Sequence, residues 1–167
     1  IPHFVIRFNL PWGGSVLTSR RAPLPHHALS AISLGGIPST YVPARNTIFL
    51  SFALSWADQL GADAIVIGAN AIDYSGYPDC RPNFMKAVSK VARLGTRLGT
   101  EGRKQIKILS PLIKLTKADI VKLGSQLGVP FNLTWSCYQG GITPCGRCDA
   151  CQLREKGFRE YGKSVHH

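Results

Sequence analysis

The chain has 167 residues, 44% of them hydrophobic, which is enough for one globular domain with a packed core. It has no run of about 18 apolar residues, and its first residues lack the basic and apolar segments of a signal peptide. We therefore expect no membrane partner and a cytoplasmic location, which suits clustered cysteines. The net charge of +11 favours phosphate-bearing partners, although a solvated basic surface explains it equally well.

The first third of the chain is expected to hold one strand, one long loop and one helix. The apolar, partly β-branched segment Phe4–Phe8 predicts a buried strand. A stretch rich in Gly, Pro and Ser continues to Pro43. Loops of that length usually have a function or are mobile, so we expect this one to be partly disordered or to act as a lid. From Asn46, apolar residues recur at helical spacing as far as Leu60, and Gly61 ends the predicted helix.

The rest of the chain alternates predicted strands and helices. The continuous apolar run Ala64–Gly68 is typical of a parallel strand covered on both faces. Pro82 starts a helix with a basic outer stripe formed by Lys86, Lys90, Arg93 and Arg97. Ile106–Ser110 predicts the next strand, and Thr116 is the expected N-cap of a helix over Lys117–Leu127. This order predicts a single α/β domain over residues 1–167, built on a parallel sheet.

Four of the five cysteines follow a C-x7-C-x2-C-x2-C pattern: Cys137, Cys145, Cys148 and Cys151. Four thiolates suit a closed, tetrahedral, structural zinc site, and an iron–sulfur cluster would accept the same ligands. Two disulfides are the alternative, but C-x2-C-x2-C leaves little room for two unstrained bridges. We predict a metal-binding element over residues 133–160, and the ligand set alone does not name its metal.

Polar side chains gather in the loop after the predicted strand Ala64–Gly68. In an open parallel sheet, ligands bind at the carboxyl ends of the strands. Asp73 and Asp79 could accept hydrogen bonds from the N–H groups of a heterocycle, and Tyr77 could stack on it. The other candidate substrate-binding side chains of this loop are Tyr74, Ser75 and Arg81. An ordinary turn with packed tyrosines is the alternative.

Two predicted helix starts carry residues suited to anions. Arg45 and Asn46 lie where a helix N-terminus offers free N–H groups, so they form a candidate anion or carboxylate site. Lys114 and Lys117 lie near the start of a later helix and are candidates for contact with phosphate. A solvated surface charge is the alternative at each position.

Three segments resemble one known family when they are taken together. They are Tyr-Val-Pro-Ala-Arg-Asn-Thr at 41–47, Asp-Tyr-Ser-Gly-Tyr-Pro-Asp-Cys-Arg at 73–81, and Leu-Thr-Trp-Ser-Cys-Tyr at 133–138. With the later cysteines they are similar to the 7-cyano-7-deazaguanine synthase family over about residues 1–158. The resemblance implies a Rossmann-like, adenine-nucleotide α-hydrolase-like fold of the PP-loop superfamily, a structural zinc and a cytosolic homodimer.

The resemblance also implies an activity. It is the ATP- and Mg2+-dependent ligation of 7-carboxy-7-deazaguanine and ammonia to the nitrile through adenylated intermediates, in queuosine biosynthesis and hence tRNA modification. The loop 73–81 would recognise the deazaguanine, and Arg45 and Asn46 its carboxylate side. This chemistry needs no Ser, Cys or His nucleophile, so we identify no catalytic nucleophile and interpret Cys80 as a packing residue.

The sequence departs from the family pattern at two points. The family's N-terminal Ser-Gly-Gly-x-Asp-Ser loop, which holds the ATP pyrophosphate, is not found here, so we expect the N-terminal nucleotide-binding part to be missing from these residues. The spacing from Cys137 to Cys145 is one residue shorter than the resemblance implies. Two alternatives therefore stay open: a degenerate or split relative that binds a deazapurine without catalysis, and a zinc-stabilised RNA-binding module, although we expect no direct contact with nucleic acid.

Overall fold

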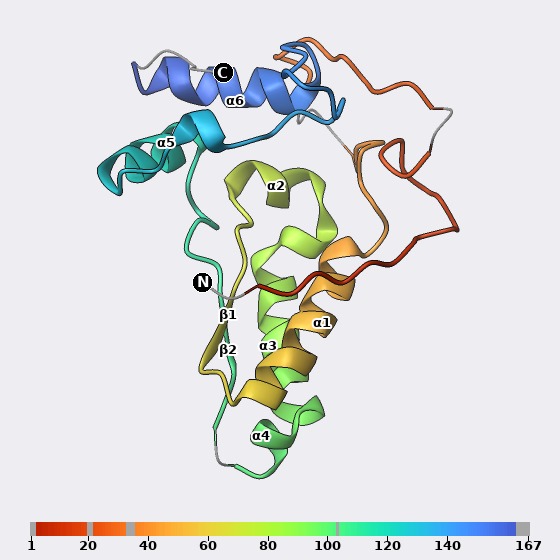
Figure 1. The fold of residues 1–167 in the computed structure, drawn as a ribbon, viewed down its shortest axis with the longest axis vertical. Coiled ribbons are helices and arrows are strands. Elements are labelled where there is room, and N and C mark those ends of the chain that lie inside the picture. Colours follow the sequence, from red (N-terminus) through yellow and green to blue (C-terminus); the bar gives the residue numbers. More distant parts are fainter. Residues whose placement is uncertain (1–2, 20–21, 33–35, 103, 163–167) are drawn as a thin grey trace.

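The computed structural model describes residues 3–19, 22–32, 36–102 and 104–162, without the side chains of Tyr74 and Ser75. A parallel pair of strands lies beside two long helices, and two further helices lie together at one end of the molecule (Figure 1). The elements in chain order are α1 (Arg45–Leu60), β1 (Ala64–Val66), α2 (Ala71–Gly76), η1 (Pro78–Cys80), α3 (Pro82–Gly95), α4 (Arg97–Thr100), β2 (Lys107–Leu109), α5 (Lys117–Gln126), η2 (Phe131–Leu133) and α6 (Asp149–Glu160).

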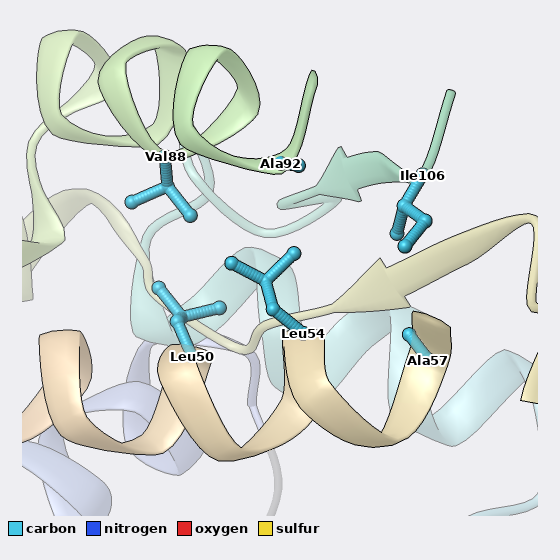
Figure 2. Packing of buried hydrophobic residues seen from close by; sticks show 6 residues of the cluster. All are labelled: Leu50, Leu54, Ala57, Val88, Ala92 and Ile106. Carbon is cyan, nitrogen blue, oxygen red and sulfur yellow. The ribbon is translucent and has the colours of Figure 1, made fainter. Parts of the chain in front are cut away.

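The described sheet has two parallel strands, with Ile65 of β1 opposite Ile108 of β2. These two side chains pack against α1 and α3, whose buried residues face each other as Figure 2 shows. The members of this core are Leu50, Leu54, Ala57, Val88, Ala92 and Ile106. On the other face, Val66 is 67% exposed and Leu109 44% exposed. The expectation of a parallel strand is thus confirmed, but the expectation that both faces are covered is wrong within the described residues.

Local sequence signals explain where most elements begin and end. Gly61 takes a left-handed φ of 68° and ends α1, and its N–H contacts the carbonyls of the last turn. Pro82 occupies the first turn of α3. Thr116 and Asp119 form a capping box at α5, and Asn70 and Asp73 form another at α2. The predicted helix starting positions near Asn46, Pro82 and Lys117 are therefore confirmed to within a residue.

The N-terminal segment differs from the prediction. Phe4–Phe8 forms no strand, and its side chains are largely exposed rather than buried. It crosses α1 instead (Figure 1). There the rings of Phe4 and Trp56 lie 4.9 Å apart and those of Phe8 and Phe52 lie 5.3 Å apart. The apolar side chains of such a segment can pack against a helix as well as within a sheet, so composition alone does not determine that the segment forms a strand.

The other end of the molecule is formed by α5 and α6 (Figure 1). Gly157 of α6 allows this close packing, because a Cβ atom there would lie 2.7 Å from the Cβ atom of Lys117. Beside it, the rings of Phe131 and Phe158 meet edge to face at 5.0 Å. Among the described helices, none has the length and apolar character that crossing a membrane requires.

Candidate functional site

The four predicted metal ligands lie together. The Sγ atoms of Cys137, Cys145, Cys148 and Cys151 are all within 4.8 Å of one another. A tetrahedral site with Zn–S bonds of about 2.3 Å places its sulfur atoms about 3.8 Å apart. The Sγ atoms of Cys145 and Cys151 are 4.0 Å apart, and all the cysteines are free thiols. The cluster is thus of a size to hold a metal ion.

Backbone N–H groups point at these sulfur atoms, as thiolate ligands require. The N–H of Cys148 donates to Sγ of Cys145 at 3.3 Å, and the N–H groups of Gln139 and Cys145 donate to Sγ of Cys137 at 3.3 and 3.4 Å. The donation from Cys148, then that from Arg147, lowers the pKa of the Cys145 thiol to about 6. At Cys145 these donors favour the deprotonated form that binds metals, whereas burial raises the pKa of the Cys151 thiol to about 12.

A cavity of about 940 Å³ lies beside this cluster. Its walls come from the loop before α1, from α2 and α5, from the cysteine-rich segment and from α6. The polar and charged side chains that line it include Thr40, Asp73, Tyr77, Lys117, Ser136, Tyr138 and Arg154. A volume of this order holds a drug-sized ligand, and a few polar groups on mostly apolar walls are typical of such sites.

Asp73 is the acidic residue of α2 in this cavity. Its Oδ2 atom accepts hydrogen bonds from the backbone N–H and the side-chain amide of Asn70, which orients the carboxylate. Burial raises the pKa of Asp73, while the charge of Lys117, the Asn70 hydrogen bonds and the charge of Arg45 oppose that rise. The carboxylate is therefore held in place next to two cations, in a setting poor in water.

Tyr77 and Tyr138 line the same cavity, and Tyr41 packs on Tyr77. Tyr77 exchanges a hydrogen bond of 2.9 Å with the Thr40 hydroxyl and stacks on Tyr41 at 6.1 Å between ring centroids. The Tyr41 hydroxyl accepts the N–H of Ala44, the residue before α1, which has a left-handed φ of 52°. The pKa of Tyr138 is raised because its hydroxyl is withdrawn from water and lies near Tyr77 and Asp73. Two aromatic rings, those of Tyr77 and Tyr138, thus line the cavity.

The structure brings only some of the predicted substrate-binding residues to the cavity. Asp73, Tyr77 and Lys117 line it, and Arg45 is close enough for its charge to act on Asp73. Arg81 and Lys114 are exposed and lie outside its lining. Tyr74 and Ser75 belong to α2, but their side chains fall outside the described part of the structure.

Asp79 and Asn46 form a buried connection behind the cavity. Asp79 is only 6% exposed, and its Oδ2 atom accepts the Asn46 N–H at 2.9 Å. The Asn46 amide donates to the Asp79 carbonyl at 3.1 Å and to Sγ of Cys80 at 3.0 Å. Burial, with the charges of Asp73 and Asp79, raises the pKa of Cys80 to about 12, which makes a thiolate there unfavourable. This thiol agrees with the packing role expected for Cys80, and direct ligand contact by Asp79 and Asn46 stays a prediction.

Sequence reasoning missed Thr40, Tyr138 and Arg154. Tyr138 directly follows Cys137, the first of the predicted metal ligands, so its place in that motif was the available signal. Arg154 contacts the Phe131 carbonyl at 2.9 Å and lies 5.0 Å above the Phe158 ring, so α6 holds it at the cavity. No local pattern marks Thr40 or Arg154, because both reach the cavity through long-range packing.

Comparison with known proteins identifies the protein family to which the chain belongs. The family model described as "Queuosine biosynthesis protein QueC" matches residues 1–162. The chain therefore belongs to the QueC family of queuosine biosynthesis proteins.

The curated relatives carry a specific name. The chain is 56% identical to a 7-cyano-7-deazaguanine synthase of Nostoc sp. (strain PCC 7120), over 97% of this chain and 71% of the relative. It is 53% identical to the synthase of Trichodesmium erythraeum, over 97% of this chain and 73% of the relative. It is 52% identical to that of Saccharophagus degradans, over 95% of this chain and 69% of the relative. These matches confirm the resemblance to the synthase family and do not favour the alternatives of a non-catalytic relative or an RNA-binding module.

Proposed function

We propose that this protein is a carbon–nitrogen ligase of queuosine biosynthesis that makes 7-cyano-7-deazaguanine from 7-carboxy-7-deazaguanine, ammonia and ATP. The observation that carries this proposal is identity above 50% to synthases across nearly the whole chain. The cavity supports it, because a carboxylate, two cations and aromatic rings surround a space that suits a flat, polar, anionic heterocycle.

The reaction needs two activations of one carbon. In the first activation, the substrate carboxylate oxygen attacks the α-phosphorus of ATP and pyrophosphate leaves. Ammonia then adds to the acyl carbon, AMP leaves and a proton is lost, which gives the amide. The amide oxygen attacks a second ATP and pyrophosphate leaves again. Loss of the second AMP and of protons from nitrogen leaves the nitrile. Charge develops on phosphate oxygens in both activations, so cations and N–H groups around them accelerate the reaction.

Each residue has a proposed role in this scheme. The Asp73 carboxylate accepts N–H groups of the pyrimidine edge of the deazaguanine, and Tyr77 and Tyr138 flank the ring. Arg45 and Lys117 attract the substrate carboxylate and, after adenylation, the phosphate attached to it. Lys117 is the first residue of α5, where the free N–H groups of the helix N-terminus add to the positive electrostatic potential. Asn46 and Asp79 hold the start of α1 against η1. No side chain acts as a covalent nucleophile.

The metal ions have separate roles. Zn2+ is the ion we propose for the four thiolates, where it would fix the fold of the cysteine-rich turn. Mg2+, when bound with ATP, neutralises charge on the leaving pyrophosphate. In keeping with the family resemblance, we also propose an adenine-nucleotide α-hydrolase-like (PP-loop) fold, a homodimer, a cytoplasmic location and use of the product for tRNA modification.

Substitution of Asp73 tests the site assignment in the full-length protein. Asp73→Asn keeps the size of the side chain but removes its charge and one acceptor, so the KM for 7-carboxy-7-deazaguanine should rise about 10- to 100-fold, as expected for losing a hydrogen bond to a charged group. Asp63→Asn is the matched control, because the Asp63 side chain is 87% exposed and lies outside the cavity lining. Pyrophosphate release reports the rate, and an unchanged KM in Asp73→Asn would show that the base binds elsewhere.

A further inference from the structure

One wall of the cavity is not part of any regular element. Residues 27, 31, 32 and 36–40 line it, all from the long segment before α1. We define residues 26–32 and 36–40 as the cavity wall. One end of the wall is held at Ser39, whose carbonyl accepts the Val16 N–H at 3.0 Å and the buried Ser15 hydroxyl at 3.2 Å.

The other end is held by two side chains of α6 and by the backbone carbonyl of Arg147 in the cysteine-rich segment. The His27 N–H donates to Oδ1 of Asp149 at 3.1 Å, and the His27 ring nitrogen Nδ1 lies 2.8 Å from Oδ2 of the same carboxylate. The Gln152 amide donates to the His27 carbonyl at 2.8 Å and to the Arg147 carbonyl at 2.9 Å. His26 adds a contact of 3.1 Å to that carbonyl. We define these five residues as the latch.

The latch acceptors belong to the turn that carries the cysteines. Arg147 and Asp149 flank Cys148, and Asp149 is the first residue of α6, which also carries Cys151. Arg147 and Asp149 can hold the wall only while this turn keeps its conformation. A metal on the four thiolates would therefore fix the same backbone that holds the wall, because metal binding and local folding are linked.

We propose that His27, Asp149 and Gln152 are positioning residues that tie the cavity wall to the cysteine-rich turn, so that metal binding and substrate binding support each other. This inference takes the ligand, 7-carboxy-7-deazaguanine, from the proposed function. The contacts themselves join residues 121 to 125 positions apart. Linkage then requires that each ligand raises the affinity of the other by the same factor.

The test uses three variants of the metal-loaded, full-length protein. His27→Ala lies outside the cysteine-rich turn, Gln152→Ala removes both amide contacts, and Glu155→Gln is the control on an exposed position of α6. The two latch variants should keep their metal content, raise the KM for the deazapurine about three- to tenfold and leave kcat within about twofold. Amide exchange of residues 27, 31 and 32 should quicken in both and stay unchanged in the control.

A second readout measures the coupling without turnover. In the wild-type protein, saturating 7-carboxy-7-deazaguanine should slow metal transfer to a chromogenic chelator, and in Gln152→Ala it should slow transfer much less. The proposal would be overturned if the latch variants matched the Glu155→Gln control in all three readouts: the KM for the deazapurine, amide exchange of the cavity wall, and the effect of the ligand on metal release. If amide exchange of the cavity wall is faster in the latch variants but the wild-type protein binds no deazapurine, the result supports the latch and counts against the proposed function.

Discussion

Asp79 and Asn46 hold the start of α1 in place, and this positioning is separate from the direct ligand contact predicted for them. Their backbone and side-chain contacts join the first turn of α1 to η1, directly behind Tyr77. Arg45 and Tyr41 depend on the same helix start. At the scale of single residues, the site consists of a few groups facing the cavity and a buried set that fixes their positions.

Removal of the Asp79 carboxylate should therefore weaken both the fold and ligand binding. Asp79→Ala leaves the Asn46 N–H without its acceptor, which should lower the free energy of unfolding by about 1–3 kcal/mol. Deazapurine affinity should fall as well, while metal content stays unchanged. Denaturant unfolding and ligand titration measure the two effects. Loss of affinity at full stability would instead place Asp79 in contact with the ligand.

Asp58 should make part of the stability depend on pH. Its carboxylate accepts the N–H groups of Leu98 and Arg97, both at 3.0 Å, and these hydrogen bonds lower its pKa below the ordinary value of 3.8. Because the pKa of Asp58 is lower in the folded state than in the unfolded state, its charge stabilises the protein at pH values above the unfolded-state pKa. This contribution is lost as the pH falls through the folded-state pKa.

Thermal unfolding of Asp58→Asn checks that sign. The variant should melt below wild type at pH 7. The gap should begin to narrow as the pH falls below about 4 and should close as the folded wild-type carboxylate is protonated at its lower pKa. Glu155→Gln is the matched control, with no expected gap at either pH. A gap of constant size from pH 7 to pH 3 would contradict the role of the Asp58 charge.

At the scale of elements, the cavity depends on how closely α6 approaches α5. Gly157 faces the backbone of Lys117, and a Cβ atom on Gly157 would lie 3.0 Å from the Lys117 carbonyl carbon. Lys117 is also a cation of the cavity. The same contact therefore sets helix packing and the position of a charged site residue.

A methyl group at this contact should be costly. Gly157→Ala should destabilise the protein by about 1–3 kcal/mol through overpacking and should raise the KM for ATP or the deazapurine by moving Lys117. Gly95→Ala in α3 is the control, because its nearest neighbour would be 3.9 Å away. That control should be neutral or slightly stabilising. Equal unfolding midpoints for the two variants would show that α6 can move without cost.

The elements that local patterns predict well are those with their own start and stop signals. Pro82, Thr116 and Gly61 mark boundaries that the structure confirms. Phe4–Phe8 and the outer face of β1 were predicted wrongly, because an apolar run does not specify which surface it will meet. The cysteine cluster followed from spacing alone, since its ligands are local in sequence.

The cavity could be predicted only in part. Asp73, Tyr77 and Lys117 were identified because each lies next to a strand end or a helix start. Thr40, His27 and Arg154 come together only when the segment before α1 meets α6, more than 100 residues later in the chain. Such contacts arise from tertiary packing, and no periodicity or spacing in the sequence encodes them.

At the scale of the whole molecule, two regions meet at the cavity. The β1–β2 pair with α1 and α3 forms the main core, and α5, α6 and the cysteine-rich turn form the other end (Figure 1). The cavity is lined by α2, which connects to the first region through η1, and by α5 and α6 from the second region. A ligand bound in the cavity should therefore stabilise both regions. This agrees with the proposal that the cysteine-rich end of the molecule helps to shape the substrate site.

The most direct test of the central claim follows nitrogen from ammonia into the product. Full-length protein is incubated with 7-carboxy-7-deazaguanine, ATP, Mg2+ and isotopically labelled ammonium, and the products are analysed by mass spectrometry while pyrophosphate is counted. We predict a labelled nitrile, with two pyrophosphate molecules released for each nitrile and none without the deazapurine. A protein that binds the deazapurine but yields neither labelled amide nor labelled nitrile would contradict the assignment as a carbon–nitrogen ligase.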